Sequence, residues 1–364
     1  MNAILNKNKT MTPVKAAICS FGLSGRVFHA PFLHLHPGFE LYSVMERSKD
    51  LAKAIYPTVH TPRTLEELLD DKAVELVIVN TPNYTHYAFA KAALLAGKHV
   101  VVEKPFASTV AEAKELAALA ATAGRKLSVF QNRRYDSDYK TVKKILGEGW
   151  LGKIVEAEIH YDRYVPALSP KSHKETPGPG TGIVYDLGTH VIDQALQLFG
   201  MPEAVFADLA ITRPGSRVED YMELLFHYPA VQNLRVRIKG GYFVREAVPA
   251  YIMHGVLGSF LKKRADPQED QLVAGKLPGG KDWGTEPPEE NGTDKGLLHT
   301  EKDGKTIRER VPTLQGNYLE YYDGIYEAIR NDKALPVTAE HGIMTMRIIE
   351  AAYESYKKKT LTPL

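Results

Sequence analysis

Residues 14–25 read VKAAICSFGLSG, an apolar run that ends in a turn with two glycines, and this stretch decides the fold. Three more short apolar runs follow in the first third of the chain, at Leu41–Met45, Leu76–Asn80 and His99–Val102. Helix-like sequence separates them, and its clearest example, Val110–Ala123, begins with a capping box at Thr109. Near-continuous apolar strands between helices are typical of a parallel sheet covered on both faces. We therefore expect a doubly wound α/β domain over residues 14–131.

The pattern changes after residue 131, where β-rich segments follow one another with few helices between them. Their bounds are Ile154–Tyr164, Val205–Thr212, Tyr221–His227 and Leu234–Val244. Such strands indicate an antiparallel sheet with one face toward the core, interrupted by a helix at Asp186–Phe199. Residues 262–315 are rich in Lys, Gly, Pro and Glu, so we expect an extended loop there, docked by Trp283. Two helices end the chain, and residues 132–364 are expected to form a second α/β domain.

Length, charge and composition exclude several classes of protein. A chain of 364 residues exceeds the ~250–300 residues at which single cores stop growing, which favours two domains. Forty-six Lys and Arg against 44 Asp and Glu leave a net charge of +2, so nucleic acid and membranes are not expected partners. The single cysteine, Cys19, excludes an internal disulfide and a multi-cysteine zinc site. Residues 1–13 read as a disordered lead-in without a signal peptide's apolar region, so we expect a cytoplasmic protein.

The turn after the first expected strand, SFGLSG at 20–25, partly matches the fingerprint G-x-G-x-x-G. In that fingerprint, backbone amides and a helix N-terminus bind the pyrophosphate of a dinucleotide. Gly22 and Gly25 occupy the second and third glycine positions, and Ser20 replaces the first. Gly22 is where the backbone approaches the phosphate, so the most demanding position is retained. An ordinary turn is the alternative, and the strand before it favours the nucleotide site.

Glu46 lies at the end of the second expected strand, roughly 20 residues beyond the turn, where the fingerprint has a ribose-binding carboxylate. A carboxylate there repels a 2′-phosphate and favours NAD. Arg47 beside it would pair with that phosphate and permit NADP. A solvated charge pair is the third interpretation. The coenzyme therefore stays open between NAD and NADP, with Glu46 favouring NAD.

Polar side chains also follow the third and fourth expected strands. NTPNYTH at 80–86 follows one of them, and Glu103-Lys104-Pro105 follows the other. The carboxyl ends of parallel strands line the ligand crevice of an open sheet. Lys104 is therefore well placed for a reacting group, and capping of the strand end is the alternative.

Asp186 and His190 are four residues apart at the start of a predicted helix, so both project from one face. The spacing suits a carboxylate that orients an imidazole, or two metal ligands; a helix cap beside an interior histidine is the ordinary alternative. No HExxH pattern or cysteine accompanies the pair, and the three histidines of residues 29–36 lack convergent carboxylates, so we expect no metal. Oxidation of a secondary alcohol by a nicotinamide needs a base and a cation, which His190 and Lys104 would supply.

Six segments together resemble the Gfo/Idh/MocA oxidoreductases: GLSGRVFHAPF, TPNYTHY, AGKHVVVEKP, QNRRYDSD, YDRYVP and GTGIVYDLGTHVIDQALQLFGMP. Three later segments are similar to the subgroup that contains NADP-dependent scyllo-inositol dehydrogenase: YIMHGVLGSFLKKRADPQED, WG and LPVTAEHGIMTMRIIEAAYES. The similarity covers nearly the whole chain from residue 14. It implies an N-terminal Rossmann domain and a C-terminal α/β domain with a large open, mostly antiparallel sheet. It also implies a homodimer or homotetramer assembled through that sheet.

The resemblance implies roles for single residues as well. The catalytic triplet would be Lys104, Asp186 and His190, with His190 as the acid/base. The substrate would contact that triplet and Tyr161, Arg163 and Tyr164. The coenzyme would contact Gly22, Ser24, Gly25, Arg26, Val27, Glu46, Arg47, Thr81, Asn83, His86, Glu103, Lys104, Asn132 and Arg133. Two departures concern the coenzyme: Ser20 replaces the first glycine, and Glu46-Arg47-Ser48 replaces the small residue and arginine of NADP-preferring relatives.

The leading hypothesis is an NAD(P)-dependent dehydrogenase that oxidises a ring hydroxyl of a cyclitol or sugar, or reduces the matching ketone. A dinucleotide-sensing regulator without catalysis is the alternative, and a structural protein that uses only the open sheet is the third. Retention of the whole triplet favours the enzyme, since a sensor has no need of it. The sequence names no substrate, and Tyr161, Arg163 and His254 are the residues expected to line its pocket.

Overall fold

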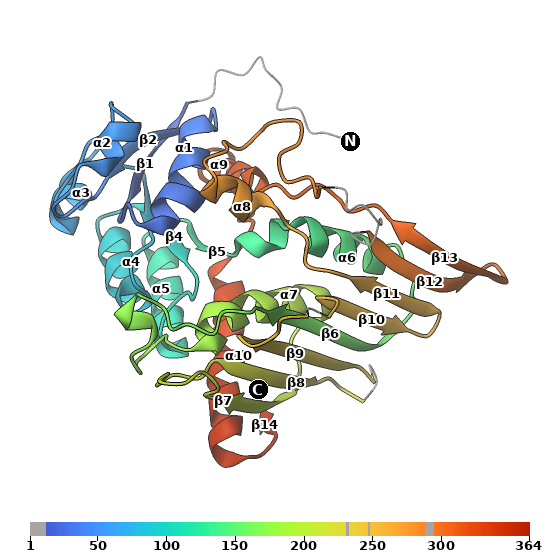
Figure 1. Ribbon diagram of the computed structural model, residues 1–364. Helices are drawn as coiled ribbons and strands as arrows, with labels where there is room; N and C mark the ends of the chain where they lie inside the picture. The colour runs from blue at the N-terminus through green and yellow to red at the C-terminus, as the bar shows by residue number, and fades with distance from the viewer. Residues whose placement is uncertain (1–11, 231–232, 247, 288–294) are drawn as a thin grey trace.

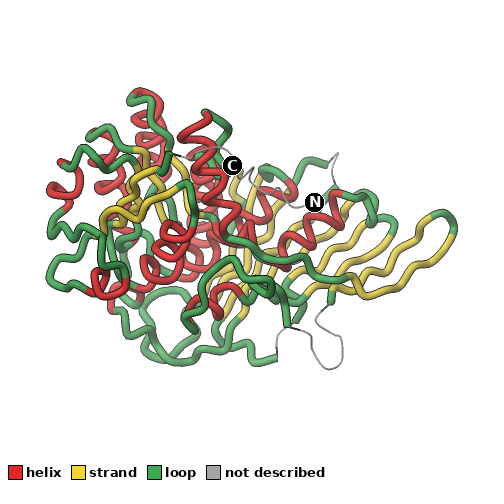
Figure 2. Tube along the Cα trace, turned by 90° about the horizontal axis from the view of Figure 1, so that it is seen from above, coloured by secondary structure: helices red, strands yellow, loops and turns green. Residues whose placement is uncertain are grey.

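The computed structural model describes residues 12–230, 233–246, 248–287 and 295–364. The expected lead-in, residues 1–13, lies almost entirely outside them. Two sheets organise the described chain, a five-stranded sheet in its first third and a nine-stranded sheet in the remainder. Figure 1 shows the two sheets next to each other, with helices packed on and between them, and Figure 2 shows the same two strand layers from above. None of the described helices is long and apolar enough to cross a membrane.

The five-stranded sheet is parallel throughout, in the order β2-β1-β3-β4-β5. Its strands are β1 (Val14–Ile18), β2 (Phe39–Val44), β3 (Leu76–Val79), β4 (His99–Glu103) and β5 (Leu127–Phe130). Helices lie on both sides of it (Figure 1), with α1 (Ala30–Leu35) and α9 (Leu319–Asn331) on one side and α4 (His86–Leu95) and α5 (Val110–Thr122) on the other. Two short helices, α2 (Leu51–Ile55) and α3 (Leu65–Asp70), follow the edge strand β2. The expected doubly wound architecture is confirmed.

Helix α5 has the ends that the sequence predicts. The Thr109 hydroxyl accepts the amide of Glu112 at 3.2 Å, and the Glu112 carboxylate accepts the amide of Thr109 at 3.2 Å. Gly124 follows the helix with a φ of +62°, in the left-handed region that favours glycine. The capping box and the glycine stop are therefore both confirmed.

The nine-stranded sheet has the order β13-β12-β11-β10-β6-β9-β8-β7-β14, and every described neighbouring pair is antiparallel except β6 and β9. Its strands are β6 (Ile154–Asp162), β7 (Ala204–Ala210), β8 (Tyr221–His227), β9 (Arg235–Gly241), β10 (Tyr251–Gly255), β11 (Gly258–Lys262), β12 (Gly296–Lys302), β13 (Lys305–Val311) and β14 (Thr362–Pro363). Three helices pack against it: α6 (Ser137–Gly147), α7 (Thr189–Phe199) and α10 (Ala339–Lys358). Buried residues alternate with partly exposed ones along β7 and β8, as one covered face requires. The mostly antiparallel sheet is confirmed.

The expectation of an extended loop over residues 262–315 is wrong. The segment contains α8 (Gln268–Val273) and the hairpin β12–β13, which forms the far edge of the large sheet (Figure 1). Strand β13, KTIRERV, is exposed or half-exposed along its whole length and has only Ile307 and Val311 as apolar residues, which is too weak an alternation to predict a strand. The docking of Trp283 is confirmed, because its side chain is buried and meets Phe32 edge-on with ring centroids 6.4 Å apart.

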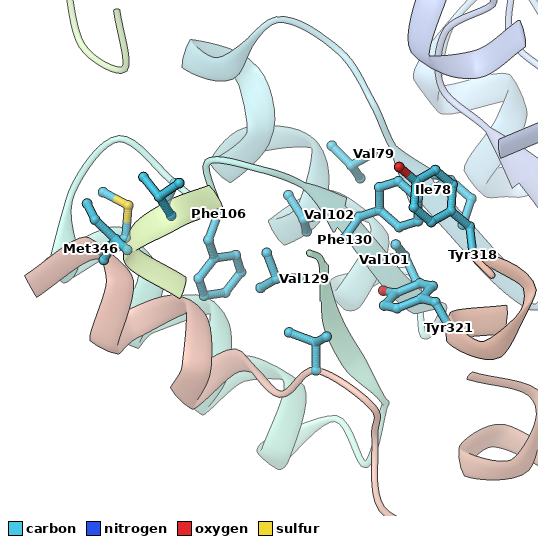
Figure 3. Close-up of a cluster of buried hydrophobic side chains, with 14 of the residues drawn as sticks. Ile78, Val79, Val101, Val102, Phe106, Val129, Phe130, Tyr318, Tyr321 and Met346 are labelled. Carbon is cyan, nitrogen blue, oxygen red and sulfur yellow. The ribbon is translucent and has the colours of Figure 1, made fainter. Parts of the chain in front are cut away.

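The last two helices return to the first sheet and complete its core. Tyr321 of α9 meets Phe130 of β5 edge-on, with ring centroids 5.0 Å apart. Figure 3 shows both residues in a buried cluster to which β3, β4, β5 and α10 also contribute. The Ser128 hydroxyl donates to the carbonyl of Val337 at 2.6 Å, which ties β5 to the start of the final helix. Since α10 also packs on α7, this core holds the ends of β4 and β5 close to the elements of the second sheet.

Candidate active site

The turns after β1, β3, β4 and β5 meet at one edge of the first sheet, because these strands all run in the same direction. Asn80 donates from Nδ2 to the carbonyl of Ser20 at 2.8 Å, which joins the turn after β3 to the turn after β1. Lys104 and Asn132 follow β4 and β5 at the same edge. In an open parallel sheet this edge is where ligands bind.

Gly22 and Gly25 have different surroundings in the turn after β1. A Cβ atom on Gly25 would lie 2.1 Å from the Ser20 carbonyl oxygen, so only glycine allows this turn to pack on its strand. A Cβ atom on the exposed Gly22 would meet Ser20 Oγ at 3.6 Å, and the space beside it is open to a ligand. Ser20 stabilises the turn, because its hydroxyl accepts the amide of Gly22 at 3.3 Å.

The next two predicted coenzyme residues begin the π-helical turn η1 (Gly25–His29). Arg26 is exposed beside the open turn. Val27 is buried, with 7% of its surface exposed, and belongs to the hydrophobic core. A coenzyme in the turn is therefore within reach of the Arg26 side chain, whereas the Val27 side chain supports the turn from behind.

A network of buried polar groups lies behind this turn. Glu103 Oε1 accepts from Ser24 Oγ at 2.5 Å and lies 3.1 Å from His29 Nε2, and His29 Nδ1 lies 2.9 Å from the Tyr322 hydroxyl. Burial acts to raise the pKa of the Glu103 carboxyl, but the contacts with His29 and Ser24 outweigh it and hold that pKa below its usual range. Glu103 thus reaches the turn through Ser24. His29, which has no carboxylate near it in the sequence, faces one from a strand 74 residues away.

Glu46 caps a helix instead of facing the open edge. Its carboxylate accepts the amides of Leu51 at 3.2 Å and Ala52 at 2.8 Å, and the residue is only 7% exposed. The carboxylate expected at the coenzyme ribose is therefore directed into the N-terminus of α2, and the expectation of NAD loses its basis. Arg47 and Ser48, the next residues in the chain, are exposed at the end of β2.

His86 braces two turns and has no exposed surface for a coenzyme. Its Nδ1 and Nε2 atoms lie 2.8 and 2.9 Å from the carbonyl oxygens of Pro105 and Thr81. Burial lowers the pKa of His86, against these two contacts, which act to raise it. The predicted coenzyme contact of this side chain is therefore not available. Asn83, nearby, donates to the carbonyl of Gly180 at 2.8 Å and so links this edge to the second domain.

Asn132 and Arg133 begin the turn after β5, and both are buried. Arg133 donates to the Tyr318 hydroxyl at 3.2 Å and also bonds the carboxylate of Glu269. These contacts fix the guanidinium 5.8 Å from the ring centre of Tyr161. Arg133, predicted as a coenzyme residue, thus extends toward the residues predicted for the substrate.

Lys104 and Asp186 meet across the two domains. Lys104 Nζ donates to the backbone carbonyl of Asp186 at 2.7 Å and to its Oδ1 at 3.2 Å. Lys174, which the sequence analysis does not single out, donates to Oδ2 of the same carboxylate at 2.8 Å. Burial acts to raise the pKa of the Asp186 carboxyl, but the charges of the two lysines outweigh it and hold that pKa far below its usual range. One carboxylate and two ammonium groups therefore form a cluster with a net positive charge.

His190 lies at the start of α7, directly after the π-helical turn η5 (Val184–Gly188) that carries Asp186. It is nearly buried, and its Nδ1 atom has no hydrogen-bond partner in the part of the chain that the structure describes. Burial and the charges of Lys104 and Arg133 hold the pKa of His190 well below its usual range, so the imidazole is neutral. Within the described residues the Asp186 carboxylate bonds Lys104 and Lys174, and His190 Nδ1 has no partner, so the orienting contact that the spacing suggests is not found at Nδ1.

Tyr161 of β6 lies close to His190 and to three guanidinium groups. Its ring is close to parallel with the imidazole, with centroids 6.2 Å apart and an interplanar angle of 28°. The guanidinium carbons of Arg264, Arg163 and Arg133 are 4.2, 5.1 and 5.8 Å from the centre of its ring. Arg163 also donates to the Tyr161 hydroxyl at 3.2 Å. Arg264 comes from a segment that the sequence analysis assigned to loop, which is why it was missed.

The other two predicted substrate residues stand apart from this group. Tyr164 is 44% exposed, and the guanidinium of Arg245 lies 4.0 Å from its ring centre. His254 pairs in the sheet with Glu156, five residues before Tyr161, which puts it roughly 16 Å along the strand from Tyr161. The expectation that His254 lines the pocket is therefore wrong.

Comparisons with known proteins cover the whole described fold. A family model described as oxidoreductase family, NAD-binding Rossmann fold, matches residues 14–131. A second one, described as oxidoreductase family, C-terminal alpha/beta domain, matches residues 143–364. The two models, GFO_IDH_MocA and GFO_IDH_MocA_C, thus coincide with the regions that build the two sheets.

Individual relatives match over nearly their full length. A scyllo-inositol 2-dehydrogenase (NADP(+)) of Bacillus subtilis is 41% identical over 359 residues, which cover 99% of this chain and 98% of its own. An uncharacterized oxidoreductase of Escherichia coli is 39% identical over 95% of this chain and 97% of its own. A solved oxidoreductase structure from Bacteroides fragilis has a TM-score of 0.88 at 44% identity, covering 97% of this chain and 100% of that one.

Proposed function

Because the chain belongs to the Gfo/Idh/MocA family of oxidoreductases, we propose that it transfers a hydride between NADP and a ring carbon of a cyclitol or sugar. The reaction oxidises a ring hydroxyl or reduces the matching ketone. The observation that carries the proposal is the contact of Lys104 with Asp186 beside a neutral His190, at the ligand-binding edge of the parallel sheet. A bound nicotinamide supplies the hydride chemistry, and the chain's own residues handle the substrate oxygen and its proton.

Lys104 binds the substrate oxygen in this proposal. An ammonium group has three N–H donors, and two of those on Lys104 reach oxygens of Asp186. The third is left for the hydroxyl oxygen of the substrate. The positive charge stabilises the negative charge that develops on that oxygen as the hydride leaves the ring carbon.

His190 accepts the hydroxyl proton during oxidation and returns it during reduction. A neutral imidazole carries one unprotonated nitrogen, so it accepts a proton without first having to release one. The low pKa of His190 keeps it in this state at neutral pH. Its buried Nδ1 atom lacks a hydrogen-bond partner among the described residues, which further supports a role in which this atom bonds a ligand or accepts a proton.

The choice of NADP rests on the end of β2. The Glu46 carboxylate is nearly buried and is held by the amides of α2, which directs it away from the 2′-position of a bound ribose. Arg47 beside it is exposed, and a guanidinium pairs well with phosphate oxygens. The relative from Bacillus subtilis that is named as an NADP(+) enzyme supports the same choice.

The substrate class rests on the relative named scyllo-inositol 2-dehydrogenase and on the group around Tyr161. The Tyr161 hydroxyl and the Arg163 guanidinium are proposed to bind ring hydroxyls, since both offer hydrogen bonds beside an aromatic face. Within this proposal residues 14–131 bind the coenzyme and contribute Lys104 to the substrate site, and residues 132–364 supply the other residues that bind the substrate. The same second domain associates with further copies through the uncovered face of the large sheet, as a dimer or tetramer.

A substrate screen tests the proposal. Inositols and aldoses are each incubated with NAD or NADP, and the absorbance of the reduced nicotinamide is followed. We expect turnover with at least one cyclitol or sugar, and a lower KM for NADP than for NAD. Coenzyme binding without turnover of any polyol or its ketone would contradict the proposal and favour a dinucleotide-sensing protein.

A further inference from the structure

We propose that Lys174 is a positioning residue of the reaction, which acts through Asp186 on Lys104; the inference rests on the role proposed above for Lys104. Lys174 lies between β6 and η5, in the stretch SPKSHKE, which carries no motif. Its ammonium nevertheless reaches the carboxylate that the Lys104 ammonium contacts. The two lysines therefore share a partner, and a change at one is transmitted to the other.

The two ammonium groups hold opposite oxygens of the carboxylate. Lys104 lies 3.2 Å from Oδ1 and Lys174 lies 2.8 Å from Oδ2 of Asp186. Rotation of the carboxylate plane would break at least one of these ion pairs. The Asp186 side chain is 31% exposed, so without Lys174 water would compete for Oδ2 and leave the carboxylate free to turn. Lys174 thus holds the Asp186 carboxylate in one orientation, and that carboxylate positions the Lys104 ammonium.

The charge balance gives Lys174 a second effect. Asp186 positions Lys104, but a carboxylate next to an ammonium also cancels its charge. With Lys174 present, the three groups carry a net charge of +1 and the region around the substrate oxygen stays positive. Stabilisation of a developing alkoxide depends on that positive potential. Lys174 therefore allows Asp186 to hold Lys104 without removing the charge that the reaction needs.

The segment that follows Lys174 is anchored at two points, which separates this pair from an ordinary surface ion pair. Glu175, the next residue, pairs with the buried Arg213 at 3.2 Å. Gly180 accepts a hydrogen bond from Asn83 at 2.8 Å. An exposed pair is weakened by the entropy of two free side chains, and these anchors reduce that cost on the Lys174 side. One of the anchors comes from the first domain, so Lys174 is held where the two domains meet.

Steady-state kinetics of the full-length protein test the inference with Lys174→Met, Lys174→Arg and the matched control Lys171→Met, an exposed lysine of the same segment. We expect kcat of Lys174→Met to fall roughly 10- to 100-fold, the scale of a small misplacement of a reacting group, with an unchanged KM for NADP. Lys174→Arg should recover most of the activity, and Lys171→Met should match the wild type.

Two results would overturn the inference. One is a wild-type kcat in Lys174→Met, and the other is a Lys174→Arg variant as impaired as Lys174→Met. Lys174→Gln replaces Lys174→Met if thermal unfolding shows that the methionine variant is misfolded. Lys104→Met is measured alongside. Loss of turnover in Lys104→Met with normal turnover in Lys174→Met overturns this inference alone, whereas full activity in Lys104→Met overturns the proposed function with it.

Discussion

Glu103 and Lys104 are neighbours at the end of β4, yet their side chains belong to two different networks. Glu103 turns toward the first domain, where Ser24 and His29 occupy its carboxylate and the residues are nearly buried. Lys104 turns toward the second domain, where it bonds Asp186 and keeps one donor for a ligand. The first network is paired within the protein, and we propose that a ligand completes the second.

This difference separates side chains that stabilise the structure from side chains that we propose to act in the reaction. Buried polar groups in proteins are almost always paired, so a paired network stabilises the turn that it holds. A buried group left unpaired costs free energy and persists where a ligand completes it, as we propose for His190 Nδ1. Changes in the Glu103 network should therefore affect stability and coenzyme binding, and changes in the Lys104 network should affect turnover.

The largest effect is expected in the Lys104 network. Lys104→Met and His190→Ala should each lower kcat by at least ~100-fold, because each removes electrostatic or proton-transfer assistance at the substrate oxygen. Coenzyme affinity, measured by fluorescence titration, and the midpoint of thermal unfolding should stay near the wild-type values. Near-normal turnover in both variants would remove the distinction between the two networks.

The Glu103 network should respond in the opposite way. Glu103→Gln removes the charge that bonds Ser24 and His29, so the free energy of unfolding should fall by about 1–3 kcal/mol. The turn that it supports should loosen, and KM for the coenzyme should rise more than kcat falls. Denaturant unfolding and coenzyme titration measure these effects, with Glu115→Gln as the exposed control. A variant that loses kcat but keeps its stability would assign Glu103 to the chemistry.

The pH dependence of alcohol oxidation tests the environment of His190 without a mutation. His190 must be neutral to accept a proton, and burial with the charges of Lys104 and Arg133 lowers its pKa below the ordinary 6.5. Alcohol oxidation should therefore stay at its plateau at pH 6.5 and decline only at lower pH, as the imidazole becomes protonated. The acid limb of kcat/KM reports this ionisation in the free enzyme. An acid limb centred at or above pH 6.5 would show that the imidazole is not in the environment described.

The smallest effects are expected at the end of β2, where Glu46 and Arg47 form a second contrasting pair of neighbours. Glu46→Ala removes the cap of α2 and should cost about 1 kcal/mol of stability, with the preference between NAD and NADP unchanged. Arg47→Ala should weaken NADP binding about tenfold, the equivalent of ~1.4 kcal/mol, and leave NAD binding unchanged. A shift toward NADP in Glu46→Ala would restore the ribose role for this carboxylate.

The sequence alone predicts those features whose pattern lies within a few neighbouring residues. The apolar runs of the first sheet, the capping box of α5 and the four-residue spacing of Asp186 and His190 are all read within a few residues. The resemblance to a family supplied the rest of the candidate triplet. The structure confirms the fold that these signals predict.

The missed features depend on contacts between distant segments. His29 meets Glu103 across 74 residues, and Arg264 reaches Tyr161 from a segment that is polar and rich in turn formers. Glu46 stands where a ribose-binding carboxylate is expected, and only the structure shows that its oxygens cap α2. Strand β13 has only two apolar residues, Ile307 and Val311, so its periodicity is weak.

Transfer of deuterium from the coenzyme to the substrate tests the central claim most directly. The protein is incubated with NADPH that carries deuterium on the transferable position of the nicotinamide and with the ketone formed by oxidising one hydroxyl of scyllo-inositol. Mass spectrometry and NMR then locate the label. We predict one deuterium on the former carbonyl carbon with the wild type, and at least ~100-fold slower labelling with Lys104→Met. Tight coenzyme binding with no label on this ketone, or on any other ketone of a cyclitol or sugar, would contradict the account.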